Sequence, residues 1–217
     1  NSKTSTYAED QLFSGTVEID GRGNTTWGVP KRPYNIDLID DAGEELKVPL
    51  LDMPAHDEWC LLAFWHDRSL MCIPMAMFLG RHMDGFFWAP RLQYVEVFIN
   101  GDYRGLYNLC EKIGRGDDRL NIKKLTTDEF DQVEPRVSGG YILEGSSLGK
   151  LKPIEQQRAI TTSEDNIIFS FKYPKSKNVT DEQRAWIKSY LDEFERVLRS
   201  EQYKDPTNGY RKYINVE

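Results

Sequence analysis

Two short segments of the sequence contain residue types that could hold an anionic ligand. The first is the turn Gly21-Arg22-Gly23-Asn24, which Lys31 follows. Glycines let backbone amides approach an anion closely, and successive amides can form a nest for a phosphate group. Arg22 and Lys31 could supply positive charge to the same oxygens. The spacing matches neither a P-loop nor the kinase G-x-G-x-x-G loop, so on spacing alone a plain strand-connecting turn is favoured.

The second segment is Glu111-Lys112, which lies at the end of a predicted strand. A carboxylate at this place could orient a phosphate-binding lysine, as an ion pair does in kinases. Taken alone, the pair is better interpreted as solvated charges, which contribute roughly 0–1 kcal/mol to stability.

The remaining reactive residue types do not form a recognisable catalytic or metal-binding pattern. The three histidines have no paired metal-ligand spacing, and there is no G-x-S-x-G elbow or Ser-His-Asp arrangement. The cysteines, Cys60, Cys72 and Cys110, match neither a zinc spacing nor a disulfide framework. We therefore expect three buried free thiols and no metal ligands.

Composition excludes several classes of protein. The 217 residues are 39% hydrophobic and 12% aromatic, which argues for a folded domain rather than disorder. The formal net charge of −7 disfavours a nucleic-acid partner, because phosphate backbones need clustered lysine and arginine. No apolar run approaches the roughly 18 residues of a transmembrane helix, so we expect no membrane-spanning segment.

Alternating and helical patterns place these segments on elements. The Asn100-Gly101 pair predicts a type I′ hairpin. Helices are predicted from about Met71 to Met83 and, with a Thr180/Gln183 capping box, over 180–200, whereas 145–165 is polar and irregular. The predicted strands are Thr16–Asp20, Tyr34–Ile39, Leu46–Leu50, Trp59–Trp65, Leu92–Ile99, Tyr103–Cys110, Tyr141–Glu144 and Ile167–Tyr173. This order predicts an α+β fold, a mostly antiparallel sheet with one early and one late helix, after a flexible segment 1–15.

A series of short motifs extends from the glycine turn almost to the end of the chain. They are Gly21–Trp27, Lys31–Tyr34, Leu50–Pro54, Trp59–Ala63, Asp67–Met71, Tyr94–Gly101, Tyr103–Tyr107, Glu111–Ile113, Arg119–Ile122 and Gly139–Glu144. In order and density they resemble the CotH kinase family, which is named for a bacterial spore-coat protein. The resemblance extends through 210–216 and predicts one CotH-like domain over 16–217.

The resemblance implies an atypical kinase fold that transfers the γ-phosphoryl group of ATP to serine residues of a protein substrate, with bound Mg²⁺ or a similar ion. It implies that Gly21–Asn24 is a phosphate-side loop and that Lys31 is the cation for the α- and β-phosphates. Glu111 would orient Lys31, and the strand Tyr141–Glu144, with Glu144 at its end, would lie beside adenine as a hinge. These roles are coherent, since phosphoryl transfer depends on positioning and charge neutralisation.

The resemblance also sets limits on activity. In the family, the base and metal ligands belong to an Asn/Asp-rich segment and a Trp-Asp-Phe-Asp-like motif that follow the segment matched by 210–216. Neither occurs in the 217 residues, so we expect no catalytic residue, no metal ligand and no phosphoryl transfer within this chain.

Other functions stay open at this point. Cys72-Ile73 stands where family members tend to have Arg-Asn, which favours as an alternative a catalytically inactive binding module of the cell-surface or spore-coat type. A carbohydrate-binding surface built from the many Trp and Tyr is a third interpretation, although core packing explains Trp27, Trp59 and Trp65 more simply. We expect an exported or cell-surface location rather than a cytoplasmic one.

Overall fold

The computed structural model describes residues 13–23 and 25–215. Asn24 of the predicted phosphate-side loop and most of the predicted N-terminal segment 1–15 lie outside the described residues. The chain divides into two compact units, with residues up to 81 and 89–112 in unit 1 and residues 82–88 and 113 onward in unit 2.

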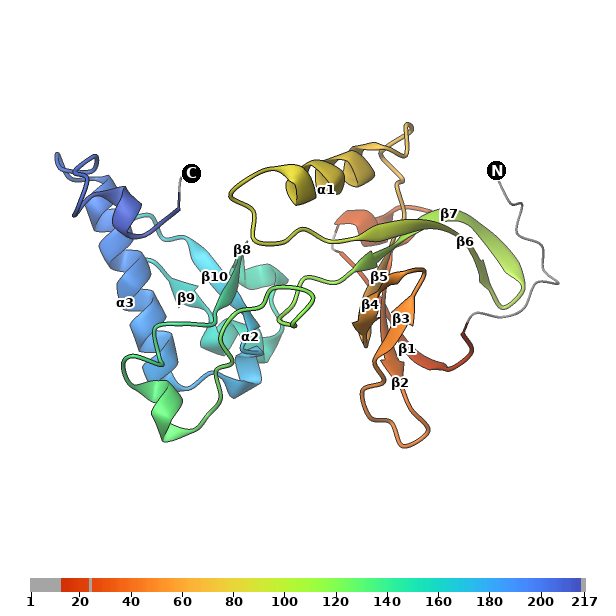
Figure 1. Ribbon diagram of the computed structural model, residues 1–217, viewed down its shortest axis with the longest axis horizontal. Coiled ribbons are helices and arrows are strands. Elements are labelled where there is room, and N and C mark those ends of the chain that lie inside the picture. The colour runs from red at the N-terminus through yellow and green to blue at the C-terminus, as the bar shows by residue number, and fades with distance from the viewer. Residues whose placement is uncertain (1–12, 24, 216–217) are drawn as a thin grey trace. The chain divides into compact units, whose positions relative to one another are not determined.

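Unit 1 is built on a five-stranded sheet with the order β1-β2-β5-β7-β6, in which every neighbouring pair is antiparallel (Figure 1). A two-stranded sheet, β3-β4, accompanies it. Helix α1 (Cys72–His82) belongs to this unit apart from its last residue. The strands are β1 (Thr16–Gly21), β2 (Tyr34–Ile39), β3 (Val48–Leu50), β4 (Met53–His56), β5 (Glu58–Leu62), β6 (Leu92–Ile99) and β7 (Asp102–Glu111), and a 3-10 turn spans Thr25–Gly28.

The hairpin β6-β7 confirms the strongest local prediction. Asn100 and Gly101 both have positive φ, 53° and 84°, as a type I′ turn requires. Further along the hairpin, the register shifts between the pairs Val97–Gly105 and Phe98–Tyr103, and Gly105 adopts a φ of 92°. A glycine at a bulge permits this left-handed conformation, which a residue with a Cβ adopts only with strain.

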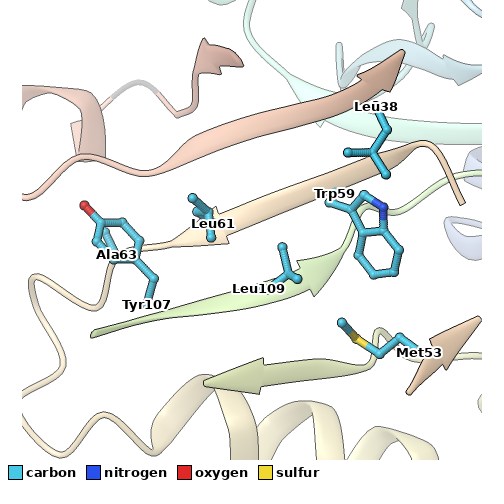
Figure 2. Packing of buried hydrophobic residues seen from close by; sticks show 7 residues of the cluster. All are labelled: Leu38, Met53, Trp59, Leu61, Ala63, Tyr107 and Leu109. Atoms are coloured by element: carbon cyan, nitrogen blue, oxygen red, sulfur yellow. The ribbon is translucent and has the colours of Figure 1, made fainter. Parts of the chain in front are cut away.

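One face of the five-stranded sheet carries the hydrophobic core of unit 1. Trp59 is completely buried, and its neighbours in the core come from strands β2, β4, β5 and β7 and the residue just after β5 (Figure 2). The cluster consists of Leu38, Met53, Trp59, Leu61, Ala63, Tyr107 and Leu109. Side chains alternate along a strand, so Tyr107 and Leu109 mark the core face of β7, and Asn108 and Cys110 point to the opposite face.

Unit 2 contains a three-stranded antiparallel sheet with the order β8-β10-β9, against which helix α3 packs (Figure 1). Its strands are β8 (Ile142–Ser146), β9 (Ile160–Thr161) and β10 (Ile168–Tyr173), and its helices are α2 (Pro153–Arg158) and α3 (Asp181–Leu198). Its 3-10 turns span Glu129–Gln132, Leu148–Lys150, Ser176–Asn178 and Tyr210–Lys212. Ile160, Phe171, Val179 and Ile187 form its buried core.

The N-terminal end of α3 follows from its sequence. The Gln183 amide donates to the Thr180 hydroxyl, and the Thr180 amide donates to the Gln183 side chain, both at 3.2 Å. This reciprocal pair is the predicted capping box, and it satisfies backbone donors that the first helical turn leaves open.

The structure confirms the α+β class with mostly antiparallel sheets, but it corrects the prediction that 145–165 is irregular. This stretch contains the short helix α2 and the strand β9. Pro153 supplies the φ that a first helical turn needs, and the Glu155 carboxylate accepts a hydrogen bond from the Lys152 amide at 2.8 Å. Six residues are too few for a helical periodicity to be visible in the sequence.

Candidate functional site

The two glycines of the predicted phosphate-side loop are explained by contacts within the turn. A Cβ on Gly21 would lie 2.7 Å from the indole ring of Trp27, which folds back over this glycine. Gly23 has a φ of 81°, and a Cβ there would come 2.1 Å from the Thr26 hydroxyl oxygen. The glycines therefore let the turn close tightly, and this requirement holds whether or not an anion binds.

The same turn is anchored to the core face of the sheet. Trp27 meets the ring of Tyr34 edge to face, with centroids 5.9 Å apart, and the Arg32 guanidinium lies over the Trp27 ring at 4.8 Å. Tyr34 packs against the hydrophobic core of unit 1. The turn and its aromatic contacts consequently belong to the face that carries Tyr107.

Lys31 lies on this face as well. Its ammonium donates a hydrogen bond to the Leu106 carbonyl and lies 4.7 Å from the centre of the Tyr107 ring. The Tyr107 hydroxyl donates to the carbonyl of the next residue, Arg32, at 3.0 Å. The structure thus brings Lys31 and the Trp27 side of the glycine turn to one face of the sheet.

Arg22 extends to the other face. Its guanidinium donates to the Asn35 side chain at 3.1 Å, and Asn35 alternates with Tyr34 along β2 and so points away from the core. The structure does not bring Arg22 to the Lys31 ammonium.

The surroundings of Lys31 are neutral. Among the described residues, no carboxylate forms an ion pair with its ammonium, and partial burial lowers the pKa of Lys31 below its ordinary value of 10.5. Within the described part of the chain, the ammonium donates to the Leu106 carbonyl and lies over the face of the Tyr107 ring. A partly desolvated cation that lacks a counter-charge is a favourable binding position for an anion.

Glu111 has a different partner. It is 1% exposed, and its Oε2 accepts hydrogen bonds from the Arg91 amide at 2.7 Å and the Arg91 guanidinium at 3.1 Å. Lys31 contacts β7 at Tyr107, four residues before Glu111, which is roughly 13 Å at about 3.3 Å per residue. The structure does not bring Glu111 to the Lys31 ammonium.

Lys112 is paired with acidic groups on the face away from the core. Its ammonium lies 2.9 Å from Glu58 and 3.3 Å from Asp37. Burial alone would lower the pKa of Lys112, but the two carboxylates outweigh it and raise the pKa. Two carboxylates of the chain therefore compensate the charge of Lys112, in contrast to that of Lys31.

Glu144, the predicted hinge residue, lies in unit 2. It is exposed on β8 and forms an ion pair with Lys172 of the neighbouring strand β10 at 2.7 Å. β8 is an edge strand of its sheet, so one side of its backbone has no neighbouring strand within that sheet.

A family model described as CotH kinase protein matches residues 19–217. This chain belongs to the CotH kinase family. A search of the curated proteins found no match to the sequence. Membership confirms the resemblance drawn from the motifs, and for this CotH-family chain it points to a kinase-like protein with nucleotide and metal use in general.

The described part of this CotH-family chain does not provide a metal centre. Residues 13–23 and 25–215 include no group of three or more His, Cys, Asp or Glu side chains that could hold a metal ion. Over the same residues, no helix combines the length and the apolar character that crossing a membrane requires.

The prediction of buried free thiols is confirmed for two of the three cysteines. Cys60 and Cys110 are buried free thiols, as expected, whereas Cys72 is exposed at the start of α1. The expectation was wrong for Cys72 because the first turn of a surface helix leaves its outward side chains in solvent.

Sequence reasoning did not find the residues that hold Lys31. Leu106 contributes only a backbone carbonyl, which no side-chain pattern reveals, and Tyr107 reads as an ordinary core aromatic. A signal was nevertheless present in Gly105, because a glycine inside a strand indicates a bulge or a close approach of another group.

Proposed function

We propose that this chain binds the phosphate groups of ATP through Lys31 and forms the nucleotide-binding portion of a CotH-family kinase that phosphorylates serine residues of a protein substrate. The observation that carries the proposal is the environment of Lys31, a partly buried ammonium that the described residues leave without a carboxylate. A nucleotide triphosphate offers the missing negative charge, and a lysine is a common point-charge ligand for phosphate oxygens.

The chemistry of the family supports this assignment. Phosphoryl transfer is accelerated mainly by positioning and by neutralising charge on the phosphate oxygens, and a preorganised ammonium serves both purposes. ATP would supply the transferred phosphoryl group. Arg32 is next to Lys31 but is engaged over the Trp27 ring, so we assign the phosphate contact to Lys31.

Calorimetric titration of the chain with ATP and Mg²⁺ tests the phosphate assignment. Lys31→Met keeps the aliphatic contact with Tyr107 and removes the charge, so we expect at least a tenfold loss of affinity, about 1.4 kcal/mol. The matched control is Lys150→Met, which removes an exposed lysine of unit 2 and should bind as the wild type does.

Circular dichroism establishes that both variants fold. Equal affinity of the wild type and Lys31→Met would overturn the role of Lys31. Absence of any binding by the wild-type chain would overturn the nucleotide proposal itself and favour an inactive interaction module.

A further inference from the structure

The contacts of Lys31 come from the part of β7 that extends beyond its neighbour β5. β5 ends at Leu62, which pairs with Asn108, and Leu106 lies two residues before Asn108 along β7. Because hydrogen-bonding direction repeats every second residue, the Leu106 carbonyl points toward the side where β5 has already ended. The Lys31 ammonium occupies this place and donates to the carbonyl.

Tyr107 holds the same segment at a second point. Its ring lies under the Lys31 ammonium, and its hydroxyl donates to the carbonyl of Arg32. Tyr107 is 2% exposed and part of the core of unit 1, so its ring is fixed by packing and cannot follow a mobile lysine. The ring therefore defines where the ammonium lies.

The bulge at Gly105 completes the arrangement. The Lys31 Nζ and Cε lie 3.6 Å from the position that a Cβ on Gly105 would occupy. That distance is an ordinary van der Waals contact, so the lysine lies directly against the strand at the bulge, and the positive φ of the bulge is what requires a glycine there.

We infer that Tyr107, together with the Leu106 carbonyl, is the positioning residue of the phosphate-binding Lys31, in the role that a carboxylate has in an ion pair. This inference rests on the proposed function. A neutral holder orients the ammonium and leaves its charge available, whereas a carboxylate would neutralise it before the ligand arrives. An aromatic face also attracts a cation, which opposes the desolvation that burial imposes.

The inference is tested by weakening the attraction of the ring for the cation in steps, while the shape of the side chain at position 107 is largely kept. Tyr107→Phe removes the hydroxyl and keeps the ring, and replacement of Tyr107 by a ring-fluorinated phenylalanine then weakens the attraction for a cation. The readout is the pKa of Lys31 in the ligand-free protein, from the ¹³C resonance of its Cε, assigned by its absence in Lys31→Met. The other titratable or charged groups around Tyr107 are Tyr34 on β2 and Arg104 on β7, and they stay unchanged throughout.

We expect the Lys31 pKa to fall by about half a pH unit between the phenylalanine and fluorinated proteins, because a ring contact favours the charged form. ATP affinity should fall in the same order. An unchanged Lys31 pKa across the series would overturn the inference.

The titration of the ligand-free protein separates this inference from the proposed function. A fluorine-dependent pKa combined with no ATP binding would overturn the nucleotide proposal and retain Tyr107 as the residue that positions Lys31. ATP binding that needs Lys31 combined with an unchanged pKa would do the reverse.

Discussion

Asp131 in unit 2 and Lys31 in unit 1 are two charged groups that the chain surrounds in different ways, and Asp131 is buried whereas Lys31 is partly buried. In unit 2, Asp131 is 1% exposed and accepts hydrogen bonds from the Thr126 amide at 2.7 Å, from the Thr126 hydroxyl at 2.8 Å and from the Arg136 guanidinium. In unit 1, the Lys31 ammonium donates a hydrogen bond to the Leu106 carbonyl and lies over the Tyr107 ring. A charge whose hydrogen-bond and ion-pair partners all come from the chain stabilises the fold. A charge contacted only by neutral groups remains available to a ligand.

The pKa values express the same difference. The hydrogen bonds from Arg136 and Thr126 lower the pKa of Asp131 to about 2, which shows that the folded chain favours its charged form. Burial lowers the pKa of Lys31, so the folded chain disfavours the charged form there. The comparison predicts that removing Asp131 costs stability and that removing the Lys31 charge costs binding.

The largest expected effect is that of Asp131→Ala. Deletion leaves the Thr126 amide without its acceptor and removes the ion pair with Arg136, and we expect the free energy of unfolding to fall by about 2 kcal/mol. Urea denaturation followed by circular dichroism measures this loss. Glu129→Ala removes an exposed carboxylate of the same 3-10 turn and should stay within about 0.5 kcal/mol. Equal stability of the two variants would contradict a structural role for Asp131.

Acid should weaken the same interaction without a mutation. Because the folded pKa of Asp131 is lowered from 3.8 to about 2, its stabilisation is complete above pH 4 and is lost as the pH falls toward 2. Denaturation of the wild type and Asp131→Asn at several pH values should show a difference that shrinks over this range. A difference that stays constant from pH 7 to pH 2 would show that the charge of Asp131 does not contribute.

Arg136→Met removes one partner of Asp131 and leaves the Thr126 hydrogen bonds in place. Arg136 is half exposed, so we expect a loss of only about 1 kcal/mol in the free energy of unfolding. Arg196→Met, on the surface of α3, is the matched control and should be close to neutral. A loss as large as that of Asp131→Ala would mean that the arginine alone holds the carboxylate.

The smallest expected effect on stability is that of Lys31→Met. The lowered pKa of Lys31 means that its charge opposes folding at neutral pH, and methionine keeps the aliphatic contact. We expect the free energy of unfolding to change by no more than about 0.5 kcal/mol, or to rise slightly. A marked destabilisation would show that the charge of Lys31, like that of Asp131, stabilises the fold, and would contradict the proposed difference between them.

The sequence predicted the elements whose signals are local. Asn100-Gly101 fixed a hairpin because only residues that tolerate positive φ fit a type I′ turn, and Thr180 with Gln183 marked the start of α3 through one pair of hydrogen bonds. The six-residue helix α2 was missed because its length leaves no periodicity to detect.

The candidate site could be predicted only in part, because its geometry depends on tertiary contacts. Lys31 was found from residue type and family motif, but its contacts are a carbonyl and a ring on a strand about 75 residues later. Glu111 was the expected partner by analogy with kinase ion pairs, whereas strand pairing brings Arg91 to it. Arg22 follows the last residue of β1, and its guanidinium donates to Asn35, whose side chain points to the face away from the core.

The most direct test of phosphate binding by Lys31 is an NMR titration of lysine-labelled protein with ATP and Mg²⁺, in which the Lys31 Cε resonance is followed. We predict that this resonance moves on saturation and that the pKa of Lys31 rises in the complex, because a phosphate anion favours the charged form. A Lys31 pKa that is the same with and without bound ATP would contradict it.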